Sequence, residues 1–423
     1  MNAIPTGPLA PLYIRDFRYL LAGFAIGQML MPLQFITQIL WVQHYAPKDF
    51  WLILVAFIAT SRGLGALTFG LYGGALADRF NRRKLLLAVQ TLQIFCTAAI
   101  ALLMYNSVGG VAGFSLFFLL TFISSGLQSI DAPTRLAIVP DILGRERTAA
   151  GMSLNQVAGQ VAMPLVMAMT GIIIDAAGFS GAYLFSAIGH FLAIVFIALM
   201  AYQPIVATSH TTTWHDGFRE IFKDIGIGIN YARNHPIILW VIILLVMMMS
   251  LGYPATASLG PTWVTTVVEV PIPRMGFVVM FWGLGSLTAA ILLTRFSSTE
   301  RRGALVAFGA LLFAISFVIF VTGRQEINVI IGNFGLGAGM TITMVSSTIL
   351  IQHLVPNEIR GRIMSIFQLN MAFAQLMTMP VAMLGQWLTL PILFPVMSFL
   401  TLALVIVILI TQPQLIRAVT SQH

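Results

Sequence analysis

Three charged side chains stand inside stretches of sequence that are otherwise apolar. Arg62 lies near the middle of one such stretch, and another contains Asp131 and, four residues later, Arg135. If these stretches cross a membrane, an arginine near the bilayer centre costs about 2.5–3.5 kcal/mol and must face a cavity or a partner. Arg62 is therefore predicted either to contact a substrate or coupling anion, or to form a structural pair.

The order of Asp131 and Arg135 suits an ion pair on one helix. An acid four residues before a base is the favourable orientation for such a pair. The alternative interpretation makes Asp131 the carboxylate that carries a proton. Direct pairing of Asp131 with Arg62 is not expected, because about ten residues of helix, or roughly 15 Å, separate their depths. His190 is a further possible proton carrier, although a buried, hydrogen-bonded histidine is the favoured interpretation.

Amide side chains and one proline form a second group of candidates for the transport pathway. Amides inside a membrane either hydrogen-bond between helices or line a cavity, and both interpretations stay open for each residue. Pro164 should kink its helix or leave a backbone carbonyl free. The amides are Gln34, Gln38, Asn155, Gln156, Gln160 and Asn333, with Gln368, Asn370 and Gln375 as additional polar points.

One loop carries a specific motif between two apolar stretches. It reads Gly74-Ala75-Leu76-Ala77-Asp78-Arg79-Phe80-Asn81-Arg82-Arg83-Lys84. The glycine permits close helix packing and the aspartate can pair with a cation. The basic residues alone would indicate only a loop on the cytoplasmic side of a membrane.

The order of these letters resembles the loop signature of the major facilitator superfamily, with Asn81 in place of the usual glycine. Three more stretches, 61–63, 131–141 and 355–365, are similar to the branch that contains enterobactin exporters, macrolide efflux proteins and a lysophospholipid transporter. The resemblance implies a latch that stabilises the outward-facing state, built here from Gly74, Asp78, Arg79, Arg82 and Arg83. Residues 159–164, followed by Gly171, resemble an antiporter motif in which Met163 replaces a glycine.

Composition places the chain in a membrane. Of 423 residues, 58% are hydrophobic and 9% are charged, whereas soluble domains average about 25% charged residues. The net charge of +8 does not indicate nucleic-acid binding, because the basic residues are spread over short loops. The single cysteine, Cys96, excludes an internal disulfide and a cysteine-based metal site. No cofactor or metal is predicted, and the ATP-binding, zinc-protease and lipase motifs are absent, so no enzyme is expected.

The apolar stretches predict an all-α membrane protein with twelve transmembrane helices. A helix needs about 20 mostly apolar residues to cross the hydrocarbon core. Nearly all arginines and lysines outside the helices fall at the termini or in even-numbered loops, which predicts cytoplasmic termini. The predicted spans are 19–43, 51–77, 84–105, 110–138, 148–175, 180–202, 236–260, 275–295, 303–323, 326–352, 362–388 and 390–411.

An internal repeat predicts two pseudo-symmetric six-helix bundles. Gly63-Leu64-Gly65 recurs as Gly283-Leu284-Gly285 at an offset of 220, and Val139-Pro140 recurs as Val355-Pro356 at an offset of 216. The predicted domains are residues 1–202, a cytoplasmic linker at 203–235 with an amphipathic helix, and residues 236–423. Parallel repeats of this kind place a substrate cavity between two halves near the bilayer midplane.

These observations predict a secondary transporter, and the resemblance implies a bacterial inner membrane. It would export a small amphipathic compound, such as a drug or siderophore, by alternating access, in exchange for protons and as a monomer. One alternative is a lysolipid-type flippase or uniporter without proton coupling. Another is a membrane sensor or assembly factor that transports nothing.

Overall fold

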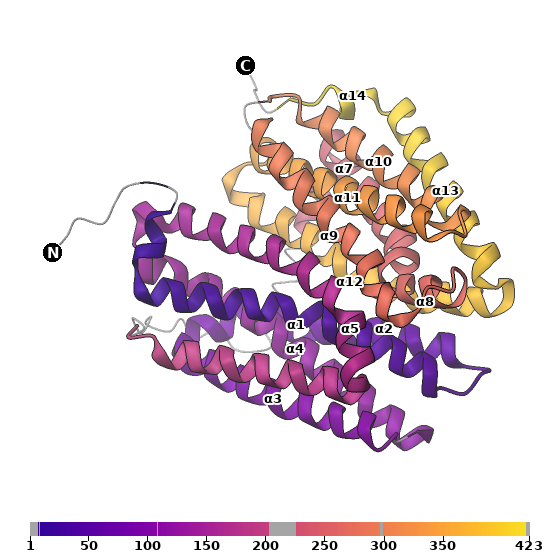
Figure 1. The fold of residues 1–423 in the computed structure, drawn as a ribbon. Helices are drawn as coiled ribbons and strands as arrows, with labels where there is room; N and C mark the ends of the chain where they lie inside the picture. The colour runs from indigo at the N-terminus through magenta and orange to yellow at the C-terminus, as the bar shows by residue number, and fades with distance from the viewer. Residues whose placement is uncertain (1–6, 8, 108, 203–225, 297–298, 420–423) are drawn as a thin grey trace. The chain divides into compact units, whose positions relative to one another are not determined.

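The computed structural model describes residues 7, 9–107, 109–202, 226–296 and 299–419, without the side chains of residues 71–75, 77–79, 145, 357, 365 and 368. The described residues are almost entirely helical and include no strand (Figure 1). The predicted amphipathic helix of the linker falls largely on residues 203–225 and lies outside them. The predicted all-α membrane fold is confirmed.

Helices α1 to α5 form the first part of the chain. Their bounds are α1 Arg15–Tyr45, α2 Trp51–Arg79, α3 Arg82–Tyr105, α4 Gly110–Leu143 and α5 Arg145–Leu199. Although α5 has 55 residues, Gly178 inside it has φ 70° and ψ 178°, so the chain turns there. Glycine adopts this left-handed conformation without steric cost. The element therefore contains two spans, 145–177 and 179–199.

The second part of the chain begins with a broken span. Helix α7 (Pro236–Tyr253) leads into a π-helical segment, η2 (Pro254–Ser258), and then into α8 (Gly260–Thr266). Proline has no N–H to continue an α-helical ladder, which accounts for the change at Pro254. The span predicted at 236–260 is therefore present as α7 followed by η2, and α8 continues beyond it to Thr266.

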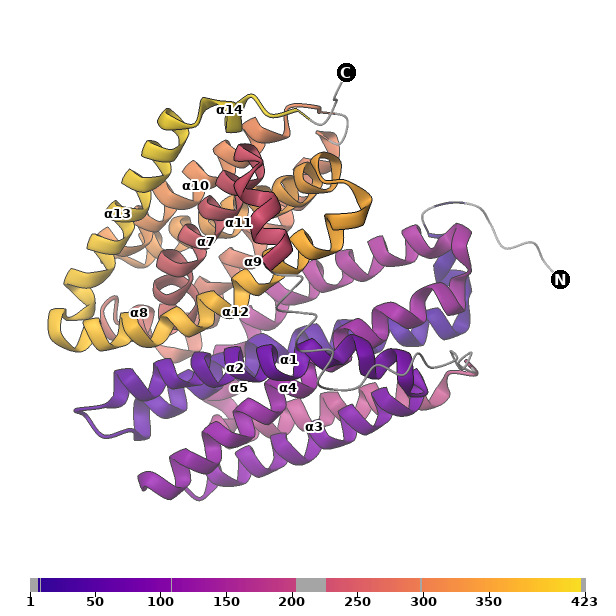
Figure 2. The same ribbon diagram turned by 180° about the vertical axis from the view of Figure 1, so that it is seen from behind.

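Six further helices complete the chain (Figure 2). They are α9 Ile272–Arg295, α10 Arg302–Thr322, α11 Glu326–Leu354, α12 Asn357–Leu388, α13 Leu390–Thr411 and the short α14 Pro413–Ile416. In the described part of the chain, eleven helices are long and apolar enough to cross a membrane. Because α5 counts twice, the number of spans matches the predicted twelve.

The chain packs as two compact units. The first unit comprises residues 1–209 with 272–277, and the second comprises residues 210–271 with 278–423. The predicted domain boundaries at 202 and 236 stay a prediction.

The two units share a packing device that supports the internal repeat. In the first unit, a methyl group added to Gly65 of α2 would collide with the Phe122 carbonyl of α4. In the second unit, the repeat-related Gly285 of α9 has the same relation to the Phe334 carbonyl of α11. Each glycine thus lets two helix backbones approach closely, as is common between membrane helices.

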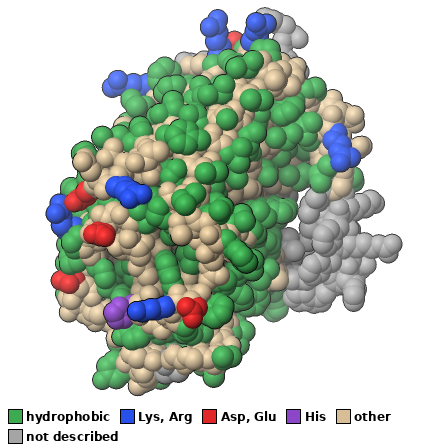
Figure 3. Space-filling model, turned by 90° about the vertical axis from the view of Figure 1, so that its right-hand side faces the viewer, with side chains coloured by type: hydrophobic (Ala, Val, Ile, Leu, Met, Phe, Trp, Pro, Cys, Tyr) green, Lys and Arg blue, Asp and Glu red, His purple; other side chains and the backbone are tan. Residues whose placement is uncertain are grey.

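Large apolar side chains also cover the outer surface of the helices. Phe95, Leu102, Ile188 and Phe191 are each more than half exposed. Figure 3 shows one face on which hydrophobic side chains predominate and charged ones are few. Such a surface suits lipid rather than water.

Candidate functional site

Polar side chains from five spans meet inside the first unit. Spacings of three or four residues place each set on one face of its helix: Gln34 and Gln38 on α1, Gln90 and Gln93 on α3. Helix α4 contributes a longer polar face, and α2 and the second span of α5 contribute one residue each. The members are Arg62, Gln128, Asp131, Arg135 and His190.

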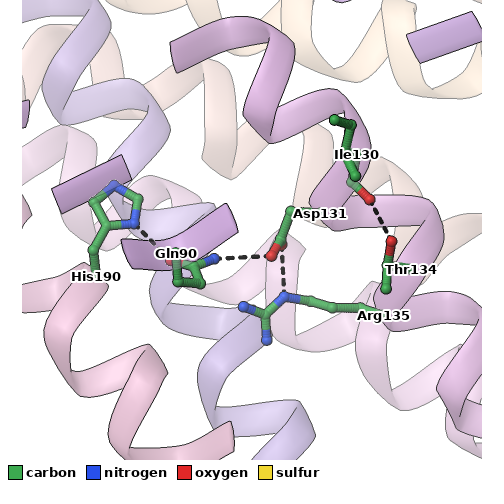
Figure 4. Close-up of polar contacts among 6 residues, drawn as sticks. All are labelled: Gln90, Ile130, Asp131, Thr134, Arg135 and His190. Carbon is green, nitrogen blue, oxygen red and sulfur yellow. Dashed lines mark hydrogen bonds and ion pairs between the residues drawn. The ribbon is translucent and has the colours of Figure 1, made fainter. Parts of the chain in front are cut away.

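Asp131 is the centre of the strongest hydrogen bonds in this group (Figure 4). Arg135 Nε donates to Asp131 Oδ2 at 2.6 Å, so the predicted ion pair on α4 is present. Gln90 Nε2 of α3 donates to Asp131 Oδ1 at 2.8 Å. The other end of that amide, Gln90 Oε1, lies 2.8 Å from His190 Nδ1. Asp131 is thus tied to three helices.

The Arg135 guanidinium is buried against helix α1. Its side chain is 1% exposed, and a methyl on Gly23 would lie 2.9 Å from Nη1, so the glycine makes room for the cation. Within the described residues, Nη1 and Nη2 have no hydrogen-bond partner. Burying a charge with incomplete pairing is costly. The cation therefore depends on Asp131 for its neutralisation.

A small hollow beside Asp131 opens between these helices. Its volume is about 160 Å³, which is roughly five times the share of liquid volume that one water occupies. Water in such a hollow would meet several amide groups and one carboxylate. The lining residues are Phe24, Gly27, Gln28, Met31, Gln90, Gln93, Gln128, Asp131, Ala132 and His190.

Arg62 joins the same network from helix α2. Its Nη2 donates to Gln128 Oε1 at 3.5 Å, and its guanidinium carbon lies 5.1 Å from the centre of the Phe35 ring. Gln128 Nε2 in turn donates to Gln34 Oε1 at 3.5 Å, and Gln34 Nε2 lies 3.3 Å from His190 Nε2. Arg62 and Asp131 are therefore linked through side chains rather than by direct pairing, as expected from their different depths.

The remaining predicted pathway residues lie in several places. Gln38 donates to Thr121 Oγ1 at 2.9 Å, and Asn333, in the second unit, donates to the Val278 carbonyl at 3.2 Å. Both amides thus form hydrogen bonds between helices. On the first span of α5, Asn155 is buried and Gln156 is exposed. Gln160 is half-buried and Pro164 lies inside the helix.

The predicted latch is described in part. Gly74, Asp78 and Arg79 belong to α2, but their side chains lie outside the described part of the structure. Arg82 Nη1 donates to Asp141 Oδ2 at 2.8 Å and to the Ala137 carbonyl at 3.0 Å, which ties α3 to α4. Arg83 Nη2 donates to the Ala198 carbonyl at 2.7 Å, which ties α3 to the last turn of α5.

Two residues beyond the motif complete this end of the first unit. Tyr202 donates to Asp141 Oδ2, the oxygen that also accepts from Arg82. Burial, together with the bond to the Asp141 carboxylate, raises the pKa of the Tyr202 phenol well above its ordinary value. Asn81 accepts from the Lys84 N–H and so caps α3 in the position where the resembled signature has glycine.

Several residues of the network were missed by sequence reasoning. Gln90, Gln93 and Gln128 carried a usable signal, because glutamine is expensive in an apolar helix and two of them share a face. Asp141 and Tyr202 gave no such signal, since they lie where helices end and polar residues are ordinary. His190 was considered but was not expected beside Asp131.

A second, larger hollow in the first unit is apolar. It has a volume of about 660 Å³ and lies between α2, α4 and the loop that precedes α2. Aromatic rings dominate its lining, and Ser61, the neighbour of Arg62, is one of its few polar residues. The lining comprises Pro47, Phe50, Leu54, Phe57, Ser61, Leu64, Gly110, Val111, Phe114, Ser115, Phe118, Leu119 and Phe122.

The described residues contain no group of three His, Cys, Asp or Glu side chains that could hold a metal ion. The chemistry that this site offers is therefore hydrogen bonding, ion pairing and proton exchange at Asp131 and His190.

Comparison with known proteins identifies the family. Residues 19–379 match the profile described as Major Facilitator Superfamily. No curated protein matches the sequence. Among solved structures, the chain is similar to a POT family transporter in complex with a thioalcohol-conjugated peptide, at 14% identity and a TM-score of 0.73, with 95% of this chain and 96% of that chain covered.

Two further structures show the same similarity of fold. The nucleoside transporter NupG has 12% identity and a TM-score of 0.71, covering 96% of this chain and 98% of its own. The peptide transporter POT in complex with sulfate has 16% identity and a TM-score of 0.69, covering 96% of each chain.

Proposed function

Because the chain belongs to the major facilitator superfamily, we propose that it is a secondary transporter that exports a small amphipathic compound in exchange for protons. The substrate would be of drug or siderophore type and would move by alternating access. The location would be a bacterial inner membrane with both termini in the cytoplasm. The protein would act as a monomer, with the lipid bilayer as its surroundings.

The observation that carries the proposal is the Asp131 site. One carboxylate, half of a buried ion pair, adjoins a hollow large enough for water and a buried histidine. Ionisable groups inside transmembrane helices are energetically expensive and usually mark a substrate or proton path. A purely structural pair would need neither the hollow nor the histidine.

The apolar hollow supports the amphipathic character of the substrate. Its 660 Å³ lies within the usual range for small-molecule sites of about 300–1,000 Å³. Apart from Ser61 and Ser115, the side chains that line it are apolar, which suits the apolar part of an amphipathic compound. The similar structures include a peptide transporter and a nucleoside transporter, and peptides and nucleosides are also small molecules.

A lysolipid-type flippase or uniporter is the second candidate. The same apolar hollow favours it, because an acyl chain needs an apolar channel and no proton carrier. A sensor that transports nothing is the third. If Asp78→Asn changed neither transport nor growth, that third candidate would be supported, because a protein that transports nothing does not need a latch.

Transport into proteoliposomes tests the proposal. The purified protein is reconstituted, and uptake of siderophores, lipophilic cations, macrolides and lysolipids is followed with and without an imposed pH gradient. We expect one amphipathic compound to move faster when protons can flow in the opposite direction. Asp131→Asn should remove the acceleration, whereas Asp175→Asn, the same substitution at an exposed residue of the first unit, should retain it.

Two results would contradict the proposal. Equal transport with and without the gradient would favour the flippase or uniporter. An acceleration that survives in Asp131→Asn would mean that protons couple elsewhere.

A further inference from the structure

The hydrogen bonds that link Arg62 to Asp131, through four intervening side chains, all have the same direction from donor to acceptor. Asp131, paired with Arg135, is a carboxylate and can only accept, so Gln90 must present its NH₂ group to it. Gln90 Oε1 is then an acceptor, and His190 Nδ1 must carry the proton that it accepts. The tautomer of His190 is thereby fixed.

The remaining bonds continue this order. With the proton on Nδ1, His190 Nε2 is an acceptor and faces the Gln34 NH₂ group. Gln34 Oε1 accepts from Gln128 Nε2, and Gln128 Oε1 accepts from Arg62 Nη2. Every donor in this chain of side chains, from Arg62 through Gln128, Gln34, His190 and Gln90, therefore points toward Asp131.

In this chain of hydrogen bonds, donor–acceptor distances are short near Asp131 and long near Arg62. The bonds around Asp131 and Gln90 measure 2.6–2.8 Å. The contacts from His190 to Gln34, Gln128 and Arg62 measure 3.3, 3.5 and 3.5 Å, at the weak end of hydrogen-bond geometry. A change that begins at Asp131 would therefore break the contact at Arg62 at low cost.

We propose that this directed chain of hydrogen bonds offers Arg62 the Gln128 oxygen only while Asp131 is ionised. The inference rests on the proposed function, in which Asp131 gains and loses the transported proton. A proton on Oδ1 makes that oxygen a donor facing the Gln90 NH₂ group, so Gln90 turns over. His190 then loses the Nδ1 proton and gains one on Nε2 by exchange with water in the hollow.

The reversal ends at Arg62. With Nε2 protonated, His190 becomes a donor toward Gln34, and the two amides beyond it turn in sequence. Gln128 then presents its NH₂ group to the Arg62 guanidinium, so two donors face each other and the contact is lost. A proton on Asp131 and a substrate bound to Arg62 in its contact with Gln128 thus exclude each other. Exchange of substrate for protons requires this exclusion.

The groups around Asp131 allow this coupling to be isolated. Arg135 faces it from its own helix, and His190 faces it from α5 through the Gln90 amide of α3. Helix α1 contributes Gln28 to the same hollow, and Arg62 of α2 is linked to Asp131 through the hydrogen bonds of Gln128, Gln34, His190 and Gln90. A direct electrostatic effect of Arg62 would survive a break at Gln90, whereas the proposed coupling would not.

A double-mutant cycle tests the proposal without any transport measurement. Infrared spectroscopy of the protein in nanodiscs follows protonation of the Asp131 carboxyl, identified by its absence in Asp131→Asn. We expect Arg62→Met to move the pH midpoint by at least about 0.5 unit, a threefold change in proton affinity. In a Gln90→Met background, Arg62→Met should move it by less than about 0.2 unit.

Matched variants control for packing and folding. Gln93 lies on the same helix and lines the same hollow, but it exchanges hydrogen bonds with Ser124 and is not in the chain. Gln93→Met should therefore leave the effect of Arg62→Met unchanged. Gln34→Met breaks the chain at a second point and should act like Gln90→Met, which keeps the test available if one variant does not fold.

Nitrogen NMR of the imidazoles gives an independent readout. The His190 signal is assigned by its loss in His190→Gln. We expect the Nδ1–H tautomer in the unmodified protein and its loss in Gln90→Met. An equal effect of Arg62→Met in both backgrounds, or an Nε2–H tautomer in the unmodified protein, would overturn the inference. If the chain of hydrogen bonds behaves as proposed but a pH gradient drives no transport, the proposed function fails. The coupling between Asp131 and Arg62 then still stands.

Discussion

The two units solve the same packing problem with different buried polar groups. Among the described residues both units bury serine and threonine hydroxyls, but the first unit adds two arginines, a histidine and five amides, whereas the second adds one arginine and two asparagines. In the first unit these side chains are Gln34, Gln38, Arg62, Gln90, Gln93, Arg135, Asn155 and His190. In the second they are Arg302, Asn333 and Asn370.

The repeat makes the difference informative. The offset of 220 that relates the glycine motifs carries Arg62 to Trp282, and the offset of 216 carries Asp131 to Ser347. Other positions are retained: Trp41 and Trp263, at an offset of 222, are both fully buried, with indole N–H groups that have no partner within the described residues. The shared positions support packing, and the positions that differ place the Asp131–Arg135 pair and Arg62 in the first unit.

The largest difference between the units is expected when one member of the buried pair is removed. Arg135→Met leaves Asp131 without its cation and should destabilise the protein by about 3–5 kcal/mol. The double variant Asp131→Leu with Arg135→Met should recover most of this loss, because both charges are then absent. Equilibrium unfolding in mixed micelles measures both.

A substitution at Ser347 of the second unit, which the offset of 216 relates to Asp131, should have little effect. Ser347 is fully buried, and its hydroxyl has no partner within the described residues. Ser347→Ala should therefore change stability by less than about 1 kcal/mol. A loss as large as that of Arg135→Met would show that the second unit contains an equally important polar site.

The spans could be predicted from the sequence because hydropathy acts over about 20 residues at a time. The break at Pro254 is a local exception, since a proline can either remain in an α-helix, as Pro32 does, or open it into a π segment. The turn at Gly178 was located to within a few residues, between the predicted spans 148–175 and 180–202.

The candidate site could be predicted only in part. Arg62, Asp131 and Arg135 are recognisable because charge is rare in apolar helices, and the ion pair follows from a spacing of four. The link from Asp131 to His190 depends on how helices α3, α4 and α5 face one another, and no pattern within one helix fixes that rotation. Gln90 joins groups 41 and 100 residues away along the chain.

An intermediate effect is expected at the glycines that the two units share. Gly65→Ala and Gly285→Ala each place a methyl group against a backbone carbonyl that cannot turn aside. Each should destabilise its unit by about 1–3 kcal/mol, and by similar amounts if the repeat is structural. Thermal unfolding of the purified variants measures this.

Glycines in open surroundings provide the controls. Gly27 in the first unit and Gly361 in the second have no atom within 4 Å of an added methyl group. Gly27→Ala and Gly361→Ala should be neutral or slightly stabilising, since alanine favours helix more than glycine does. A marked loss in only one of the two buried glycine variants would mean that the repeat does not extend to this contact.

A small effect is expected where Tyr202 meets Asp141 and Arg82. The offset of 216 carries Asp141 to Asn357, which is uncharged, so this cluster belongs to the first unit's pattern of charges. Tyr202→Phe removes one hydrogen bond to a carboxylate and should cost about 1 kcal/mol at neutral pH. The Arg82–Asp141 pair is partly exposed and should persist without it.

The pH dependence of this effect has a defined sign. Because the pKa of the folded Tyr202 phenol is raised, its stabilising contribution is complete below the ordinary value of 10.0 and is lost as the pH rises above it. The difference in stability between the unmodified protein and Tyr202→Phe should therefore shrink above that pH. A difference that stays constant or grows would show that the phenol is not held protonated by Asp141, and that the cluster contributes through packing alone.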